Sequence, residues 1–110
     1  MVEGFWIVQF AGMEGKGGGV VVVTKGKVFG GDSGFTYLGT YEEAEGNVKA
    51  NVLVQNFDPL VGNVLGIKGD FTLKLELTPN GEDELRGQAS TPAAPGFGLK
   101  AKLTRRANLF

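Results

Sequence analysis

Apolar and polar residues alternate along most of this chain, in short segments that glycine-rich stretches separate. In residues 2–11, Trp6 and Val8 fall on one side of an extended chain, whereas Glu3 and Gln9 fall on the other. The same period of two recurs in residues 35–41, 47–54, 70–78 and 97–104. A period of two is typical of a β-strand with one buried face, so the pattern predicts a series of amphipathic strands.

Glycines mark the connections between these strands. The chain holds 19 glycines and only 4 prolines, which indicates many tight turns. Residues 12–19, GMEGKGGG, predict a flexible loop before the β-branched strand GVVVVT, and Lys25-Gly26 predicts a turn into KVFGG. A further turn is expected over residues 45–47. This organisation is that of an all-β protein.

Two other glycine motifs carry more specific expectations. In Gly30-Gly31-Asp32 we expect glycines with unusual φ angles and an Asp32 carboxylate that accepts hydrogen bonds from local backbone amides. Asn80-Gly81 is the strongest two-residue hairpin signal in the chain. Both motifs therefore predict turns rather than binding sites.

Residues 58–66 interrupt the alternation and predict one short helix. Asp58 suits a helix cap and Pro59 suits a first helical position. Apolar residues then recur at helical spacing before Gly66, namely Leu60, Val61, Val64 and Leu65. With about eight strands and this helix, the sequence predicts one domain, residues 1–110, folded as a small closed antiparallel barrel, because closure removes exposed sheet edges.

The inward strand faces raise the question of a ligand. The residues expected to face the barrel interior are Trp6, Val8, Phe71, Leu73, Leu75 and Phe97. A barrel of about eight strands can hold one small molecule, and it can equally be filled by its own side chains. We expect Trp6, Val8, Val52, Phe71, Leu73, Leu75 and Leu99 to be largely buried on either interpretation.

Composition narrows the function. Histidine and cysteine are both absent from the 110 residues, which removes most acid–base and nucleophilic catalysis and the usual ligands of zinc, haem and iron–sulfur clusters. We therefore expect no enzyme, no cofactor and no metal site. The 11 basic and 12 acidic residues nearly cancel, so direct nucleic-acid binding is disfavoured. The apolar runs are too short for a membrane span and the N-terminus lacks a signal peptide's pattern, so a cytoplasmic location is expected.

Charged clusters supply the remaining candidate sites. Three like charges lie within a short segment at Glu42, Glu43 and Glu45. Such a cluster can attract a basic partner surface. On its own, however, it is more often a solvated turn, so the partner interpretation needs other support. Residues 82–84 form a second acidic tip, expected to be a simple solvated turn. The basic residues near the C-terminus, expected mainly at a solvated strand face, are Lys100, Lys102, Arg105 and Arg106. Residues 12–19 lack the Gly-Lys-Ser/Thr and helix of a phosphate loop.

The run GGVVVVTKGKVFGGDSGFTYLGTYEEAEGNVKANV resembles the GrlR-like negative regulators of type III secretion. The resemblance extends to GFWIVQF as a first strand, to GGD followed by Tyr-x-Gly, and to VLGIKGDFTLKL as a helix-to-strand passage. It covers residues 4–77, and more weakly the chain to residue 103. It implies a lipocalin-like barrel that binds and silences a transcriptional activator.

The resemblance also assigns roles to residues. The family's acidic surface motif follows the Tyr-x-Gly strand, where this chain has Glu42, Glu43 and Glu45, interrupted by Ala44. It implies a homodimer as well, to which we expect Phe5, Ile7, Leu109 and Phe110 to contribute. The sequence thus predicts a protein-binding regulator, with carriage of a small apolar ligand as the alternative.

Overall fold

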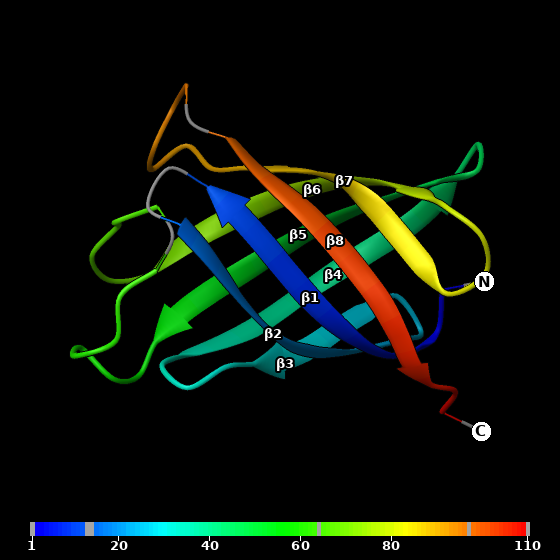
Figure 1. Ribbon diagram of the computed structural model, residues 1–110, viewed down its shortest axis with the longest axis horizontal. Helices are drawn as coiled ribbons and strands as arrows, with labels where there is room; N and C mark the ends of the chain where they lie inside the picture. The colour runs from blue at the N-terminus through cyan, green and yellow to red at the C-terminus, as the bar shows by residue number, and fades with distance from the viewer. Residues whose placement is uncertain (1, 13–14, 64, 97, 110) are drawn as a thin grey trace.

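The computed structural model describes residues 2–12, 15–63, 65–96 and 98–109, which form a closed antiparallel barrel (Figure 1). Each strand pairs with its neighbours in sequence, and the last strand pairs back with the first. The strands are β1 (Gly4–Gly12), β2 (Gly15–Thr24), β3 (Lys27–Gly31), β4 (Phe35–Ala44), β5 (Asn47–Asn56), β6 (Phe71–Pro79), β7 (Glu84–Ser90) and β8 (Gly98–Ala107). The predicted closed all-β barrel of eight strands is therefore confirmed.

The barrel core consists of the inward residues of the alternating strands. In β6, Leu73 and Leu75 are 4% and 6% exposed, whereas Thr72 and Lys74 between them are exposed. The residues predicted to be buried are all less than a tenth exposed: Trp6, Val8, Val52, Phe71, Leu73, Leu75 and Leu99. The period of two thus assigned the buried face of each of these strands correctly.

Two connections are two-residue hairpins. Thr24 pairs with Lys27 across Lys25-Gly26, and Ala44 pairs with Asn47 across Glu45-Gly46. Lys25 and Gly26 have φ angles of 49° and 79°, and Glu45 and Gly46 have 55° and 80°. Positive φ at both central residues is the signature of a type I′ turn, whose twist matches that of the flanking strands.

The predicted loop over residues 12–19 is wrong, because Gly15–Gly19 belong to β2. Gly17 pairs with Phe10, and Gly18 pairs with Gln9, so this run continues the barrel wall. A Cβ atom at Gly18 would collide with the carbonyl oxygen of Val8, which shows that glycine here permits a close approach of two strands. The described part of this run is an extended strand paired with β1, not a loop that could wrap a phosphate.

The prediction for Gly30-Gly31-Asp32 is wrong for the two glycines and correct for Asp32. Gly30 and Gly31 lie in β3 without positive φ, so the expectation of an unusual φ is wrong. Gly30 is required instead by close packing, because a Cβ atom would collide with the backbone of Val20. Asp32 does accept local hydrogen bonds, as predicted. Its Oδ1 accepts hydrogen bonds from the backbone amides of Gly34 and Phe35, each at 2.9 Å.

The predicted helix over residues 58–66 is also wrong, since the described part of this segment contains turns and no helix. Asp58 caps a turn as expected, its Oδ1 accepting the Leu60 amide at 3.0 Å. Asn63 then prevents helical bonding: its Oδ1 accepts the amides of Leu65 and Ile67, and its Nδ2 donates to the Ile67 carbonyl. Val64 lies outside the described residues.

Asn80-Gly81 lies in a hairpin, but not in a two-residue turn. Residues 80–83 separate β6 from β7, and the Asn80 amide donates to the Glu84 carbonyl at 2.8 Å. Gly81 takes a φ of 83°, whereas Asn80 is not among the residues with positive φ. The longer loop results from this difference, because a type I′ turn needs positive φ at both of its central residues.

The connections gather at two ends of the barrel (Figure 1). At one end lie the β2–β3, β4–β5 and β6–β7 connections together with both described termini. At the other end lie the β3–β4, β5–β6 and β7–β8 connections, the longest of which is residues 57–70. The described residues include no helix long and apolar enough to cross a membrane.

Candidate partner-binding site at the acidic end of the barrel

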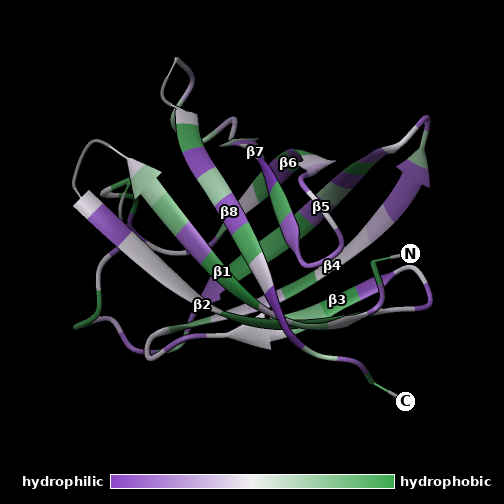
Figure 2. Ribbon diagram, turned by 45° about the vertical axis from the view of Figure 1, so that its right-hand side comes forward, coloured by the Kyte–Doolittle hydropathy of each residue, from purple (hydrophilic) through white to green (hydrophobic). Residues whose placement is uncertain are grey.

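Glu42, Glu43 and Glu45 lie at the β4–β5 hairpin, which we call the acidic hairpin. Glu42 and Glu43 lie in the last three residues of β4, and Glu45 occupies the tight turn with its φ of 55°. All three residues are exposed. Figure 2 shows β4 becoming hydrophilic as it approaches this hairpin. The local charge predicted from the sequence therefore faces solvent at one end of the barrel.

The three carboxylates do not share one face. Glu42 pairs with Lys49 and Lys49 with Glu76, so this row of alternating charges lies on the outer wall of the barrel. Glu43 pairs with Val48, which is 4% exposed, and thus lies on the inward side of the same strands. Because successive side chains of a strand alternate, Glu42 and Glu43 serve different surfaces.

The inward side leads to a broad hollow at this end of the barrel, about 750 Å³ in volume, which we call the acidic hollow. Its lining comprises Val2, Glu3, Trp6, Glu43, Pro79, Gly81, Glu82, Asp83, Leu85, Arg105, Asn108 and Leu109. Among these described residues four carboxylates face one guanidinium, above apolar side chains that include Trp6 and Leu85. The hollow therefore offers negative charge around an apolar floor.

This arrangement changes the interpretation of the second acidic tip. The sequence predicted a simple solvated turn at residues 82–84, separate from the acidic hairpin. Glu82 and Asp83 are exposed, as expected of a solvated turn, and they also line the same hollow as Glu43, although about forty positions separate them in sequence. The barrel brings these acids together because the β4–β5 and β6–β7 connections lie at the same end.

Arg105 connects the parts of the acidic hollow. Its Nε donates to Asp83 Oδ1 at 3.1 Å and its Nη2 to the Glu82 carbonyl at 3.1 Å, while Nη1 donates to the Glu3 carbonyl. Its guanidinium carbon also lies 4.5 Å from the centroid of the Trp6 ring. The side chain is only 14% exposed, so the predicted solvated position of Arg105 is wrong.

The signal for Arg105 was present in the sequence. Leu99, Ala101 and Leu103 face inward along β8, and the same period of two places Arg105 inward after them. A charged residue in the inward phase predicts a paired side chain, because an unpaired buried charge is costly. Trp6 pairs with Arg105 across β1 and β8, which brings an aromatic face to the guanidinium.

Hydrogen bonds fix two other carboxylates near this end. Glu3 Oε2 accepts the Lys25 amide at 3.0 Å and the Thr24 hydroxyl at 2.8 Å, and these bonds lower the pKa of Glu3. Glu84 Oε2 accepts Arg86 Nε and Asn80 Nδ2, which lowers the pKa of Glu84. Both residues therefore remain ionised at neutral pH, and Arg86 and Lys102 offset the charge of Glu84.

The other basic residues lie on the outer wall. Lys100 pairs with Ala11 and with Gln88, and Lys102 pairs with Gln9 and with Arg86. Lys100, Lys102 and Arg106 are exposed, as the sequence predicted. Among the described residues, no group of three or more Asp and Glu side chains is arranged to hold a metal ion.

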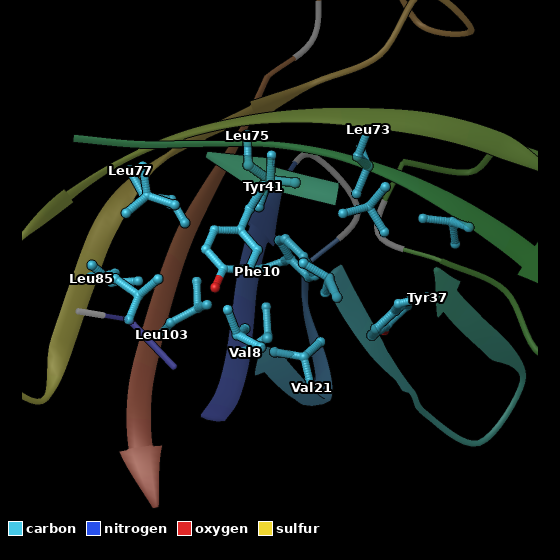
Figure 3. A pocket seen from close by; sticks show the side chains of 17 residues that line it. Val8, Phe10, Val21, Tyr37, Tyr41, Leu73, Leu75, Leu77, Leu85 and Leu103 are labelled. Atoms are coloured by element: carbon cyan, nitrogen blue, oxygen red, sulfur yellow. The ribbon is translucent and has the colours of Figure 1, made fainter. Parts of the chain in front are cut away.

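The residues predicted to line the interior separate along the barrel axis. Val8, Leu73 and Leu75 line an interior cavity with walls of apolar side chains (Figure 3). Trp6 lies at the acidic hollow, and Phe71 lines a separate pocket at the opposite end. Phe97 lies outside the described residues. The interior is thus largely packed, with a cavity remaining between the two ends.

The fold and the site define a small closed β-barrel with an acidic end. A family model described as the type III secretion system negative regulator GrlR matches residues 1–84. The chain therefore belongs to the GrlR family of negative regulators of type III secretion, and the resemblance found in the sequence is confirmed. A search of curated proteins gives no match. The family is a regulatory one, and the match includes the acidic hairpin but ends before β8.

Proposed function

We propose that this protein sequesters a protein partner, a transcriptional activator of secretion genes, at the acidic end of its barrel. The observation that carries the proposal is the acidic hollow, where Glu3, Glu43, Glu82 and Asp83 surround an apolar floor. The GrlR family supplies the regulatory context. Because the action is exerted on another protein in the cell interior, the proposal places this chain in the cytoplasm.

The chemistry of the hollow indicates the kind of surface it accepts. Clustered carboxylates steer a basic surface and raise its rate of encounter. Pro79 is exposed and Leu109 is half-buried at the hollow, so these two residues can bury nonpolar area against a partner and hold the complex together after encounter. A partner segment that carries both basic and apolar side chains satisfies both features, and a DNA-binding regulator offers such basic segments.

The acidic hairpin contributes to the same encounter from the edge of the hollow. Glu42 and Glu45 are exposed and extend the negative potential beyond Glu43. Lys49 offsets part of this charge on the outer wall, because it pairs directly with Glu42. We therefore expect Glu43 to contribute more to affinity than Glu42, and the whole hairpin to contribute mainly to the association rate.

The test is charge removal at constant size. Replacing Glu42, Glu43 and Glu45 with Gln leaves the fold intact, because exposed charges contribute little to stability. We expect the triple variant to bind a partner recovered from cells more weakly and with a smaller salt dependence. Unchanged affinity and unchanged salt response would remove the acidic hairpin from the recognition site.

A matched pair of single variants separates the two faces of β4. Glu43→Gln and Glu42→Gln change the same charge at adjacent positions, one toward the acidic hollow and one toward the outer wall. We expect the larger loss of affinity for Glu43→Gln. Glu76→Gln, also on the outer wall, is the control that removes one charge away from the hollow. Equal losses for all three variants would mean that net charge alone governs binding.

The proposal includes a homodimer, which an apolar row on the outer wall supports. Phe5 pairs with Val22, Val22 with Phe29, Phe29 with Leu38, and Leu38 with Leu53, so five apolar side chains follow one another across five strands. Phe29, Leu38 and Leu53 are 48%, 44% and 39% exposed. A contiguous exposed apolar row on an otherwise polar wall is typical of a protein contact surface.

The row revises which residues we assign to the dimer. Phe5 and Ile7 lie on the outer wall, as the sequence predicted, and Ile7 pairs with Val20, which is 40% exposed. Leu109 lines the acidic hollow instead, and Phe110 lies outside the described residues. A symmetric contact uses the same patch on both copies, so the row suits a second copy of this chain without covering the acidic hollow.

A further inference from the structure

The outer wall of the barrel carries an open groove that the proposed regulatory function does not use. It lies over β7, β8, β1 and β2, which are neighbours in the closed sheet (Figure 1), and its volume is about 780 Å³. Four of the twelve described residues that line it are cations, Lys16, Arg86, Lys100 and Lys102, and none of the twelve is acidic. We call it the basic groove. Three of its cations lie beyond residue 84, where the family match ends, so that match does not account for the groove.

Strand pairing places the four cations in two rows across the basic groove. Lys16 and Lys100 both pair with Ala11, one on each side of β1. In the next row, Lys102 on β8 pairs directly with Arg86 on β7. Neighbouring strands lie about 4.8 Å apart, so the backbones of Lys16 and Lys100 are roughly 10 Å apart and the set spans roughly 14 Å from β2 to β7. The cations therefore do not converge on one point, as the site of a single phosphate would require.

Small and polar residues fill the space between the cations. Gly17, Gly18 and Ala11 contribute at most one side-chain carbon each, so the backbones of β1 and β2 are accessible there. Gln9 and Gln88 also line the groove and are exposed. A glutamine amide both donates and accepts hydrogen bonds, as the backbone of a peptide does. The basic groove thus combines separated positive charges with groups that can pair with an extended peptide.

The basic groove keeps an excess of positive charge. Glu84 lies at its edge and offsets part of that charge, because its carboxylate binds Arg86 Nε at 2.5 Å and lies 3.6 Å from Lys102 Nζ. The side chains of Arg86 and Lys102 are nevertheless 60% and 46% exposed. Glu76, on β6 beyond the groove, pairs with Lys49. One carboxylate against four cations leaves the groove positive.

We propose that the basic groove docks an acidic segment of a second protein, extended across β7, β8, β1 and β2. Opposite charge gives the complementarity, and a span of roughly 14 Å corresponds to about four or five extended residues. Nucleic acid fits less well, because four cations allow few phosphate contacts. The only aromatic ring in the described lining, Phe10, is half-buried, so bases find no exposed ring on which to stack.

The basic groove shares no lining residue with the acidic hollow, so this proposal and the proposed function can fail separately. Fluorescence anisotropy measures the affinity of the full chain for labelled hexaglutamate, hexaglutamine and a hexathymidylate DNA strand. We expect hexaglutamate to bind about tenfold more tightly than hexaglutamine, as several exposed ion pairs together supply, and its affinity to fall as salt is added. No preference for hexaglutamate, or tighter binding of hexathymidylate, would overturn the proposal.

Two double variants locate the site. Lys100→Gln with Lys102→Gln removes two cations of the basic groove, and we expect hexaglutamate to bind about three- to tenfold more weakly. Lys27→Gln with Lys68→Gln is the matched control, since both lysines are exposed and lie outside the groove. We expect the control to lose less than about twofold, because only screened, distant charge is removed. Equal losses in the two double variants would mean that net charge binds the peptide, which contradicts a groove site.

A direct measurement on the unaltered chain covers the case in which the groove variant does not fold. Amide nitrogen and proton resonances are followed by nuclear magnetic resonance as hexaglutamate is added. Shifts that cluster at the amides of Lys16, Gly18, Gly87 and Lys102 support the proposal. Shifts confined to other faces of the barrel overturn it.

Discussion

The guanidinium of Arg105 lies over the Trp6 ring, 4.5 Å from its centroid, and the two residues pair across the β1–β8 seam of the barrel. The indole Nε1 donates to the Val2 carbonyl at 2.9 Å, and Arg105 donates to the carbonyls of Glu3 and Glu82. Trp6 is 1% exposed. This pair therefore joins the N-terminal segment, β8 and the β6–β7 loop beneath the acidic hollow.

We expect Arg105→Ala to lower the free energy of unfolding by about 1–3 kcal/mol, because the cation stacked on Trp6 is lost together with its hydrogen bonds to the carbonyls of Glu3 and Glu82. Urea denaturation followed by Trp6 fluorescence measures the change. Arg106→Ala is the matched control, since Arg106 is exposed, and it should change stability by less than about 0.5 kcal/mol. Similar midpoints for the two variants would contradict the role of Arg105.

The β6 strand offers a test of the buried face. Leu73→Ala should destabilise the barrel by about 2–5 kcal/mol, because Leu73 is 4% exposed and its truncation enlarges the cavity. Thr72→Ala, one position away on the outer wall, should change stability little. The midpoint of urea denaturation measures the stability of each variant. We expect a lower midpoint for Leu73→Ala than for Thr72→Ala.

Tyr37 predicts a loss of stability in alkali. Burial, and then the hydrogen bond to Asp32, raise the pKa of Tyr37 above its ordinary value of 10.0. Above pH 10 the unfolded chain releases this proton and the folded chain keeps it, so the free energy of unfolding falls by up to about 1.4 kcal/mol per pH unit. This contribution is fully present below pH 10.

Tyr37→Phe provides the comparison for that prediction. The variant lacks the ionisable hydroxyl, so its stability should fall less steeply than that of the unaltered protein as the pH rises above 10. All other side chains are the same in the two proteins, so their contributions cancel in the difference. Denaturation curves collected at several alkaline pH values give the two slopes, and parallel slopes would contradict the prediction.

The apolar outer row predicts the oligomeric state. Light scattering should give about twice the monomer mass at micromolar concentration, and Phe29→Ser should shift the protein to the monomer because Phe29 lies at the centre of the row. Thr40→Ser, at another exposed position on the same wall, is the control. A monomer for the unaltered chain over a wide dilution range would count against the dimer.

The sequence predicted the barrel well because its information is local. A period of two assigned the inward face of β6 and β8, and Gly26 and Gly46 marked the second position of two type I′ turns, where φ is positive. The error over residues 58–66 came where one side chain decided between two local structures. The amide of Asn63 binds the backbone groups that a helix over residues 58–66 would need.

The candidate site was less accessible to prediction, because it depends on which connections share an end of the barrel. Glu43, Glu82 and Asp83 are distant in sequence and adjacent to one hollow. The alternation of side chains along a strand predicts that Glu42 and Glu43 lie on opposite faces of β4. The sequence does not show that the inward face of β4 reaches a hollow at this end of the barrel. Arg105 follows the inward residues of β8, and its hydrogen-bond partners come from two distant segments, Glu3 near the N-terminus and Glu82 and Asp83 in the β6–β7 loop.

The β1–β8 seam has a consequence for the order of folding. Of the eight pairings that the described strands form, seven join strands consecutive in sequence, and their hairpins can form in about 1–10 μs each. Pairing β1 with β8 instead closes a loop of nearly the whole chain, and its entropy cost must be met before any seam contact forms. The meander therefore assembles first and the ring closes last, so contacts at the seam, including Arg105 with Trp6, act mainly on the rate at which the finished barrel opens.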